Sequence, residues 1–316
     1  MKTTPRLALG TVQIGLPYGI ANRSGQPVAQ EAGCILDAAW EVGVRTWDTA
    51  PAYGVSEAVI GAYLRGRGVR PRIVTKLPSV RKSLGENASR SDIQTFVRAS
   101  LSSSLERLRS DHIWGYLLHD ENDVDLAEGA VLDALRSLVA EGQIHRFGVS
   151  SYDTRVADFA VAQDDVSLLQ VPFNLVDHRF EEAIRKVETR GGSAFVRSPF
   201  LQGLFFLTPE RAEAELGVGE AVGRIQRLAE NEGLSVAALA LAYSRERSGA
   251  SYVLAGAESA DQVRDGAEGF RAPLPHDVAG EVAAIAAQFP TPILDPSRWD
   301  AVRLNAGIET STSPRP

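Results

Sequence analysis

Residues 47–54 read Trp-Asp-Thr-Ala-Pro-Ala-Tyr-Gly, a stretch that follows a strand-like segment and precedes a helix-like one. The segment before it, at 44–47, contains β-branched and aromatic residues and predicts a short strand. A helical pattern begins after it, at 56–57. We therefore expect Asp48 at the carboxyl end of a strand and Tyr53 in the loop that follows. A carboxylate and a phenol at the mouth of a sheet are a candidate proton-handling pair.

Strand-like and helix-like segments alternate on both sides of this stretch. Strands are predicted at residues 7–11, 44–48, 72–76, 113–119, 146–150, 167–172, 193–198 and 251–256. Helices are predicted at 28–41, 56–65, 92–109, 126–141, 154–162, from 180 onward, and at 220–230, 235–245, 259–270 and 276–288, with a long loop at 199–219.

Eight strands that alternate with helices indicate an α/β protein with the (β/α)8 TIM barrel fold. A doubly wound open sheet is the alternative, but at 316 residues it usually divides into two domains. No Gly-x-Gly-x-x-Gly follows the first strand, so the Rossmann fingerprint is missing. We predict one barrel domain over residues 1–290 and a C-terminal loop with a disordered tail at 291–316.

Polar side chains end three neighbouring predicted strands. Asp48 ends the second strand, Lys76 the third and His119 the fourth. The active site of a barrel lies at the carboxyl ends of its strands, so these residues and Tyr53 are expected to converge. A nearby ammonium favours a phenolate, so Lys76 is expected to lower the pKa of Tyr53 from its usual value of about 10.

This combination suits a proton donor to a carbonyl oxygen that gains charge during hydride attack, and hydride requires a cofactor. Each residue also has a structural interpretation. A lysine or aspartate at a strand end is often half of a structural salt bridge, and His119 can be a satisfied buried histidine. Their joint placement at one end of the barrel favours the catalytic interpretation over the structural one.

Composition excludes several classes of partner. Apolar residues make up 44%, which is normal for a globular protein, and the formal net charge is -7. No basic run is long, which argues against nucleic acid or an anionic membrane. The single cysteine, Cys34, is expected to be buried in a helix, and no metal site is predicted. Neither a secretory signal nor a membrane span is visible, so we expect a cytoplasmic protein.

The chain resembles the aldo-keto reductases, including bacterial members. The motifs that carry this resemblance extend along almost the whole chain: Asp-Thr-Ala-Pro-Ala-Tyr-Gly at 48–54, Ser-Glu at 56–57, Val-Thr-Lys at 74–76, Ser-Leu-Glu-Arg-Leu within 101–111, Leu-Leu-His at 117–119 and Phe-Gly-Val-Ser at 147–150. The resemblance implies a (β/α)8 barrel that binds NADP(H) or NAD(H) without a Rossmann domain. Such proteins reduce small aldehydes and ketones or oxidise alcohols.

The resemblance also implies catalytic roles. Tyr53 matches the general acid, Lys76 its pKa partner, Asp48 the counter-ion of the lysine, and His119 the group that orients the carbonyl.

The positions that the resemblance assigns to cofactor binding match the family pattern less completely than the catalytic ones. Ser150 and Gln170 match residues that contact the nicotinamide carboxamide, and Ser151 stands where an asparagine is usual. Asn174 lies near the end of the sixth strand and is expected to help line the site. Arg197 replaces the aromatic residue that stacks on the nicotinamide, although a guanidinium can stack on a flat ring too.

Two further segments resemble the regions that bind the rest of the dinucleotide. Residues 198–204 resemble the loop that grips the pyrophosphate, which marks Ser198, Leu201 and Gly203. Residues 255–262 resemble the region that holds the adenosine ribose, which marks Gly256, Glu258 and Gln262. Glu258 favours NAD because a carboxylate repels a 2′-phosphate, whereas family precedent favours NADP and Arg264 lies nearby, so the preference stays open.

The region around residues 10–19 resembles bacterial members associated with carbohydrate metabolism. Tyr18 and Trp299 are candidate walls of a substrate pocket, although aromatic residues in loops can also serve only for packing. The first strand begins near Arg6, so the hairpin that usually closes the barrel floor is expected to be absent. Trp114 stands where an aspartate is common and is expected to pack rather than to take part in catalysis.

Two other functions are compatible with parts of this pattern. The first is a catalytically weak sensor or auxiliary subunit that binds the nicotinamide cofactor on the same fold. The second is an unrelated barrel that uses Lys76 for Schiff-base chemistry. The identity of the carbonyl or alcohol substrate, the physiological direction and the oligomeric state stay open.

Overall fold

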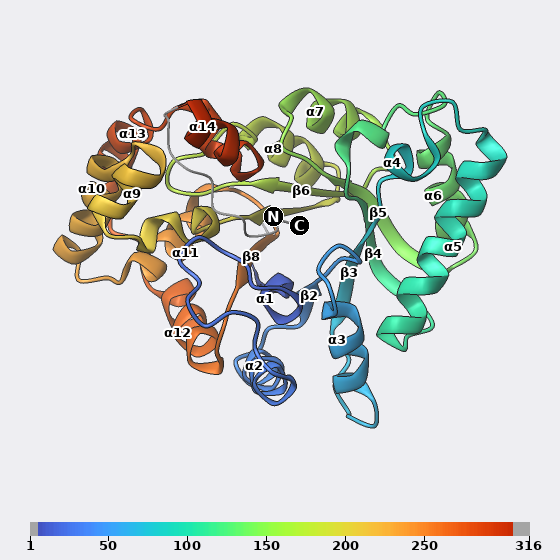
Figure 1. The fold of residues 1–316 in the computed structure, drawn as a ribbon, viewed down its shortest axis with the longest axis horizontal. Coiled ribbons are helices and arrows are strands. Elements are labelled where there is room, and N and C mark those ends of the chain that lie inside the picture. Colours follow the sequence, from blue (N-terminus) through green and yellow to red (C-terminus); the bar gives the residue numbers. More distant parts are fainter. Residues whose placement is uncertain (1–5, 306–316) are drawn as a thin grey trace.

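The computed structural model describes residues 6–305, and within them eight parallel strands close into a barrel (Figure 1). The strands are β1 (Arg6–Gly10), β2 (Thr46–Asp48), β3 (Arg72–Leu77), β4 (Ile113–Leu118), β5 (Ile144–Ser150), β6 (Leu168–Pro172), β7 (Ser193–Arg197) and β8 (Tyr252–Gly256). Each strand pairs with the next along the chain, and β8 pairs with β1, with Gly10 opposite Gly256. The predicted (β/α)8 fold is confirmed.

Helices follow the strands around the outside of the barrel. The α-helices are α1 (Val12–Gly15), α2 (Ala29–Glu41), α3 (Ser56–Leu64), α4 (Val80–Leu84), α5 (Arg90–Leu108), α6 (Ala130–Ala140), α7 (Thr154–Ala162), α8 (Glu181–Thr189), α9 (Pro209–Leu216), α10 (Gly219–Asn231), α11 (Val236–Arg247), α12 (Ala260–Arg271), α13 (Val278–Ala286) and α14 (Trp299–Asn305). Short 3-10 helices are η1 (Glu121–Asp123), η2 (Leu201–Phe206), η3 (Thr291–Leu294) and η4 (Pro296–Arg298).

Most boundaries lie within a few residues of the predicted ones, but the long loop predicted at 199–219 is wrong. It contains η2 and α9. The Thr208 side chain accepts a hydrogen bond from the Arg211 backbone N–H and caps α9, Pro209 occupies its first turn, and Gly217 ends it in the left-handed conformation. These helix signals are local, but the helix is too short to give a clear apolar period.

The segment after residue 290 is also not the loop that was predicted. It forms η3, η4 and α14, and the rest of the predicted tail, 306–316, lies outside the described residues. Arg303 of α14 is buried and pairs with Glu215 of α9 at 2.7 Å. We therefore propose that the barrel domain continues past residue 290 to include α14.

The barrel interior is filled by seven buried residues: Ala8, Val74, Leu117, Leu168, Phe195, Tyr252 and Leu254. Trp114, early in β4, packs against two of them, with its ring centroid 6.1 Å from Phe195 and 6.2 Å from Tyr252. As expected, Trp114 has a packing role, at the end of the barrel opposite the carboxyl ends of the strands. The expectation of a missing floor hairpin concerns residues 1–5, which lie outside the described residues.

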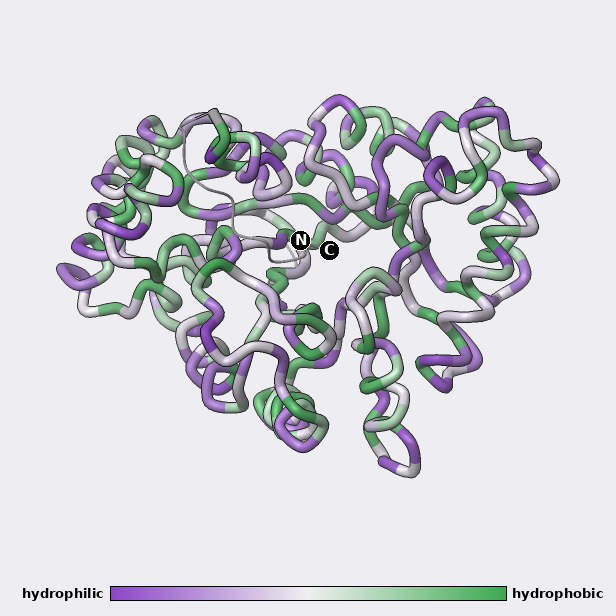
Figure 2. The backbone as a smooth tube through the Cα atoms, in the orientation of Figure 1, coloured by the Kyte–Doolittle hydropathy of each residue, from purple (hydrophilic) through white to green (hydrophobic). Residues whose placement is uncertain are grey.

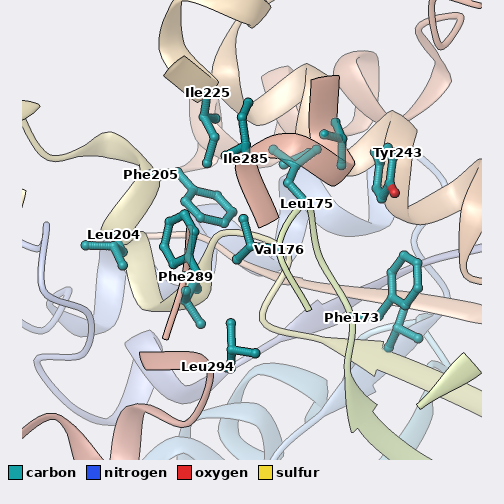
Figure 3. Packing of buried hydrophobic residues seen from close by; sticks show 14 of the residues in the cluster. Phe173, Leu175, Val176, Leu204, Phe205, Ile225, Tyr243, Ile285, Phe289 and Leu294 are labelled. Carbon is teal, nitrogen blue, oxygen red and sulfur yellow. The ribbon is translucent and has the colours of Figure 1, made fainter. Parts of the chain in front are cut away.

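A second apolar layer lies between the barrel and the helices. In Figure 3, Phe205 of η2 and Phe289 pack together with Val176 beside them, and the centroids of the two phenyl rings are 6.4 Å apart. This packing holds the loop after β7 against α10 and α13. Figure 2 shows hydrophilic and hydrophobic residues interspersed along the outer helices, as expected for helices with one face on the barrel and one in water.

Cys34 is exposed on α2, so the expectation that it is buried is wrong. The buried face of α2 is formed by neighbours such as Ala32, Ile35 and Leu36, and the helical phase turns residue 34 away from them. Within residues 6–305 no helix is both long and apolar enough to cross a lipid bilayer.

Candidate active site

Strand alternation places the carboxylate of Asp48 inside the barrel. Trp47 is fully buried in the helix-facing layer, where its ring centroid lies 5.8 Å from that of Tyr63. Because consecutive side chains of a strand point to opposite faces, Asp48 points inward. Its side chain is 1% exposed, so the carboxylate is held away from bulk water.

The loop after β2 is tied to the end of β1 by hydroxyl groups. The Thr11 backbone N–H and hydroxyl both donate to the Asp48 carbonyl, at 3.0 and 2.8 Å. The Ser56 hydroxyl donates to the Thr11 carbonyl at 3.0 Å and accepts from the Thr49 hydroxyl at 3.0 Å. These bonds fix both ends of the loop that carries Tyr53.

Two glycines let this loop lie unusually close to α1. A Cβ atom at Gly15 would lie 1.7 Å from the Tyr53 carbonyl oxygen. Gly54 has φ of +56°, and a Cβ there would lie 2.4 Å from the Gly15 carbonyl oxygen. No side chain fits at either position, so the backbone that carries Tyr53 is held by a contact that only glycine permits.

Lys76 is the centre of the predicted catalytic group. Its Nζ atom donates to Asp48 Oδ1 at 2.7 Å, to the Thr49 carbonyl at 3.0 Å and to the Tyr53 hydroxyl oxygen at 3.1 Å. An ammonium group has three protons, so all three have acceptors here. Because the Tyr53 hydroxyl oxygen accepts a hydrogen bond from Lys76, its own hydroxyl proton remains available to another acceptor.

The pKa of Tyr53 is raised, not lowered as the sequence led us to expect. Burial raises the pKa of the phenol more than the Lys76 ammonium lowers it. The pKa of Lys76 is also raised, since the Asp48 carboxylate and Tyr53 together outweigh the opposing effect of burial. Both groups therefore stay protonated near neutral pH, as a proton donor and its charged partner.

His119, directly after β4, completes the group. Its ring meets the ring of Tyr53 edge to face, with centroids 5.8 Å apart. Burial, reinforced by the nearby Lys76 charge, lowers the pKa of His119 to about 3. The imidazole is thus neutral, and a neutral imidazole can still donate one hydrogen bond.

The lowered pKa of His119 makes stability depend on pH. The unfolded chain binds a proton at this residue below about 6.5, whereas the folded protein does so only near 3, so the free energy of unfolding decreases as the pH falls through this window. Between pH 7 and pH 5 we expect His119 to account for a loss of about 2 kcal/mol. Urea unfolding of the wild type and His119→Gln at both pH values measures this, and equal losses in the two proteins would contradict it.

Gln170 has a role that the sequence did not reveal. Its Nε2 donates to the second oxygen of Asp48 at 2.8 Å, and its Oε1 accepts from the Ser150 hydroxyl at 3.2 Å. Asp48 therefore bonds Lys76 with one oxygen and Gln170 with the other. A second unpredicted contact lies behind β3, where buried Glu57 accepts from the Thr75 hydroxyl at 2.6 Å and pairs with a helix arginine.

One cavity of about 1290 Å³ joins the catalytic group to the end of β8. Tyr18, Tyr53 and His119 line one end of it. The predicted cofactor residues that also line it are Ser150, Gln170, Arg197, Ser198, Gly203, Gly256, Glu258 and Gln262. At this volume the cavity is large enough for more than one small ligand.

The side chains of Trp299, Leu201 and Ser151, which were predicted to contact the substrate or the cofactor, do not line this cavity. Trp299 is 1% exposed, packs in the apolar layer and donates its indole N–H to the Ile293 carbonyl at 2.9 Å. Leu201 is fully buried in the same layer. The Ser151 hydroxyl donates to the Glu121 carboxylate and lies within hydrogen-bond distance of the Asp153 carbonyl, so it organises the loop after β5 instead. Packing turns these three side chains away from the cavity, and their assignment to the substrate or the cofactor stays a prediction.

The turn after β7 is strained. Ser198, Leu201 and Gln202 have φ of +59°, +45° and +53°, values that non-glycine residues seldom adopt. Asn174 does not line the cavity itself but holds this turn by donating to the Ser198 carbonyl at 3.1 Å. Strained backbone of this kind gathers at ligand-binding sites, and here it carries two of the cavity-lining residues.

Comparisons with known proteins agree with this geometry. Residues 6–287 match the model of the aldo/keto reductase family. The D-threo-aldose 1-dehydrogenase of a Pseudomonas species is 27% identical over 328 residues, covering 92% of this chain and 99% of that protein. The pyridoxal 4-dehydrogenase of Microbacterium luteolum is 24% identical, covering 87% and 92%. A solved aldo-keto reductase of Bacillus halodurans, in its holo form, has the same fold, with a TM-score of 0.70 at 24% identity over 88% of this chain and 91% of that one.

Proposed function

Because this chain belongs to the aldo/keto reductase family, we propose that it transfers hydride between a nicotinamide cofactor and a small aldehyde, ketone or sugar. The observation that carries the proposal is the bond from Lys76 Nζ to the Tyr53 hydroxyl at 3.1 Å, made while Lys76 is paired with buried Asp48. Two relatives are named dehydrogenases of an aldose and of pyridoxal, which supports a carbonyl or alcohol substrate.

Tyr53 acts as the general acid. Its hydroxyl oxygen accepts a hydrogen bond from Lys76, so its own proton is free to be donated to a substrate oxygen in the cavity. As negative charge grows on the substrate carbonyl oxygen, Tyr53 gives up this proton, and the adjacent ammonium stabilises the phenolate that remains. In the oxidative direction the same phenolate removes the proton from an alcohol.

His119 positions the carbonyl. A neutral imidazole beside the Tyr53 ring can donate a second hydrogen bond to the same substrate oxygen. Two donors, from the segments that follow β2 and β4, fix the direction of the carbonyl and so present one of its faces to the cofactor.

The far end of the cavity fits a dinucleotide. The buried Gln13 Oε1 has no hydrogen-bond partner within the described residues, and a Cβ at Gly256 would lie 2.3 Å from it. The N-terminus of α12, which favours phosphate, begins at Ala260, just beyond this gap. The residues proposed to hold the cofactor are Ser150 and Gln170 at the nicotinamide end, Ser198, Gly203 and Gly256 at the phosphates, and Glu258 and Gln262 at the adenosine ribose. When bound, the cofactor supplies or accepts the hydride.

We infer a preference for NAD(H) over NADP(H). Glu258 and Asp265 line the adenosine end of the cavity, and Glu258 accepts from the Ser24 hydroxyl at 3.2 Å. Arg264, a candidate for binding a 2′-phosphate, is paired with Asp261 at 3.1 Å and with Glu41 at 3.5 Å. A 2′-phosphate would meet carboxylates there, whereas a ribose hydroxyl can donate to Glu258.

Glu258→Ala tests this preference. Removal of one carboxylate that repels a phosphate is expected to raise the relative affinity for NADP(H) by roughly tenfold, since about 1.4 kcal/mol is one decade. Fluorescence titrations of the wild type and the variant with NADH and NADPH measure the ratio. Glu268→Ala, an exposed acidic residue of the same helix that does not line the cavity, is the matched control. An unchanged ratio in Glu258→Ala would show that Glu258 does not select the cofactor.

A substrate screen tests the function itself. Aldehydes, ketones and sugars are incubated with NADH or NADPH while nicotinamide absorbance is followed, and oxidation of the cofactor by at least one carbonyl class is expected. Cofactor binding without turnover on any of them would favour the sensor alternative. The Schiff-base alternative is disfavoured, because Lys76 is fully buried and its three protons have acceptors.

A further inference from the structure

Arg197, at the end of β7, lines the same cavity as Tyr53. The central carbon of its guanidinium lies over the ring of Tyr152, 3.8 Å from the ring centroid. One of its nitrogens donates to the Ser151 carbonyl at 3.3 Å. A guanidinium has five N–H donors, so others remain for a ligand in the cavity that Arg197 lines.

The charge of Arg197 reaches the catalytic group. It opposes the rise in the pKa of Tyr53 and Tyr18 that burial causes, and it adds to the fall in the pKa of His119. These three side chains come from different parts of the chain and face one end of the cavity. Arg197 therefore stands at the reacting end and not at the adenosine end.

Within residues 6–305, Arg197 has no carboxylate partner. Lys82, the other cation that lines the cavity in the described part of the chain, is 81% exposed and pairs with Asp120 at 3.2 Å. The described ion pairs include Lys76 with Asp48 but none with Arg197. Its surroundings are neutral phenols and a carbonyl. A largely buried cation without a counter-ion is unfavourable, and an anionic ligand would relieve this cost.

We propose that Arg197 binds a carboxylate of the substrate, so that the preferred substrates are carbonyl compounds that also carry a carboxylate, such as oxo acids or sugar acids. This inference rests on the proposed function and adds the substrate class. A guanidinium edge matches a carboxylate with two parallel hydrogen bonds, and Tyr152 already covers one face of the guanidinium.

Charge balance favours a carboxylate over a phosphate. One unpaired guanidinium neutralises one negative charge, whereas a phosphate ester carries nearly two near neutral pH. Asp120 and Glu121 line the cavity as well and would repel a second charge. The nicotinamide ring has no anionic group that could pair with the guanidinium edge. The anion that pairs with Arg197 is therefore expected to come from the substrate.

The test compares matched substrates. We expect kcat/KM to be higher for succinic semialdehyde than for butanal, and the ratio of the two to fall by roughly 10- to 100-fold in Arg197→Met, mainly through KM. Arg197→Lys keeps the charge and is expected to retain part of the ratio. A ratio between two substrates on one protein is unaffected by changes in stability or in cofactor binding.

Lys82→Met is the matched control, because it removes a cavity cation that already has a partner, and its ratio is expected to stay at the wild-type value. Equal kcat/KM for the two aldehydes, or a ratio that survives in Arg197→Met, would overturn the inference. The inference would also be overturned if the kcat/KM ratio of glyceraldehyde 3-phosphate to glyceraldehyde exceeded that of succinic semialdehyde to butanal. That result would assign Arg197 to phosphate.

A binding measurement separates this inference from the proposed function. Calorimetric titration of succinate into the protein with cofactor present is expected to show binding that Arg197→Met loses and Lys82→Met retains. If no aldehyde is reduced but succinate binds through Arg197, the proposed function fails and the anion site stands. If neutral aldehydes are reduced and succinate does not bind, the function stands and the inference fails.

Discussion

Replacing Tyr53 by phenylalanine is expected to lower kcat by roughly 10²- to 10⁴-fold, the contribution typical of a general acid. The variant keeps the ring, which meets His119 edge to face, and loses only the hydroxyl that Lys76 contacts at 3.1 Å. The shape of the cavity therefore persists and cofactor affinity should change little. Steady-state rates from nicotinamide absorbance, with a fluorescence titration of the cofactor, measure both quantities.

Tyr18→Phe is the matched control for this experiment. Tyr18 is another buried phenol that lines the same cavity, and it hydrogen-bonds Gln202 instead of a lysine. Without an ammonium partner it cannot stabilise a phenolate, so its loss should cost much less turnover than that of Tyr53. Comparable losses in the two variants, or full turnover in Tyr53→Phe, would remove Tyr53 from the role of general acid.

The catalytic group was predictable because its geometry follows from local pattern and barrel topology. Asp48, Lys76 and His119 lie at or just after the ends of consecutive strands, and parallel strands of a barrel bring such positions to one rim. The distance between them in the sequence does not matter once the strands are identified. Strand identity depends on short apolar and β-branched runs, which were visible for all eight strands.

Residues in loops were less predictable, because the direction of a loop side chain depends on packing that comes from distant segments. Trp299, the first residue of α14, is buried in the apolar layer and donates to the Ile293 carbonyl, and Ser151 is held by Glu121 from the loop after β4. Glu121 lies 30 residues from Ser151 in the sequence, so no local pattern predicts this contact. The exposure of Cys34, in contrast, could have been predicted from the sequence, because the helical phase of α2 places it on a different face from Ala32 and Ile35.

The direction of the pKa change at Tyr53 was missed for the same reason. A lysine beside a phenol lowers its pKa, and this much could be inferred from the sequence. How strongly the phenol is desolvated depends on the segments that cover it, including the loop that contains Tyr18 and the turn at Gln202. In the folded protein burial is the larger effect, and it keeps the proton on Tyr53 until a substrate oxygen takes it.

Lys76→Met is expected both to stop catalysis and to destabilise the protein. Among the described residues it removes the one cation paired with Asp48, whose carboxylate is 1% exposed and then keeps only the amide of Gln170 there. Removal of one partner of a buried ion pair typically costs about 3–5 kcal/mol, because the remaining charge stays buried. Urea unfolding at neutral pH gives the change in the free energy of unfolding, and steady-state kinetics gives the change in kcat.

The double variant Asp48→Asn with Lys76→Met separates the two effects. With both charges removed, no uncompensated carboxylate remains, so most of the lost stability should return. Turnover should not return, because Tyr53 still lacks the ammonium that stabilises its phenolate. A double variant as unstable as Lys76→Met would mean that packing, not charge, determines stability here, and recovered turnover would mean that Lys76 serves only to neutralise Asp48. If the expected outcome holds, the pair that anchors the barrel rim is also the one that makes Tyr53 an effective acid.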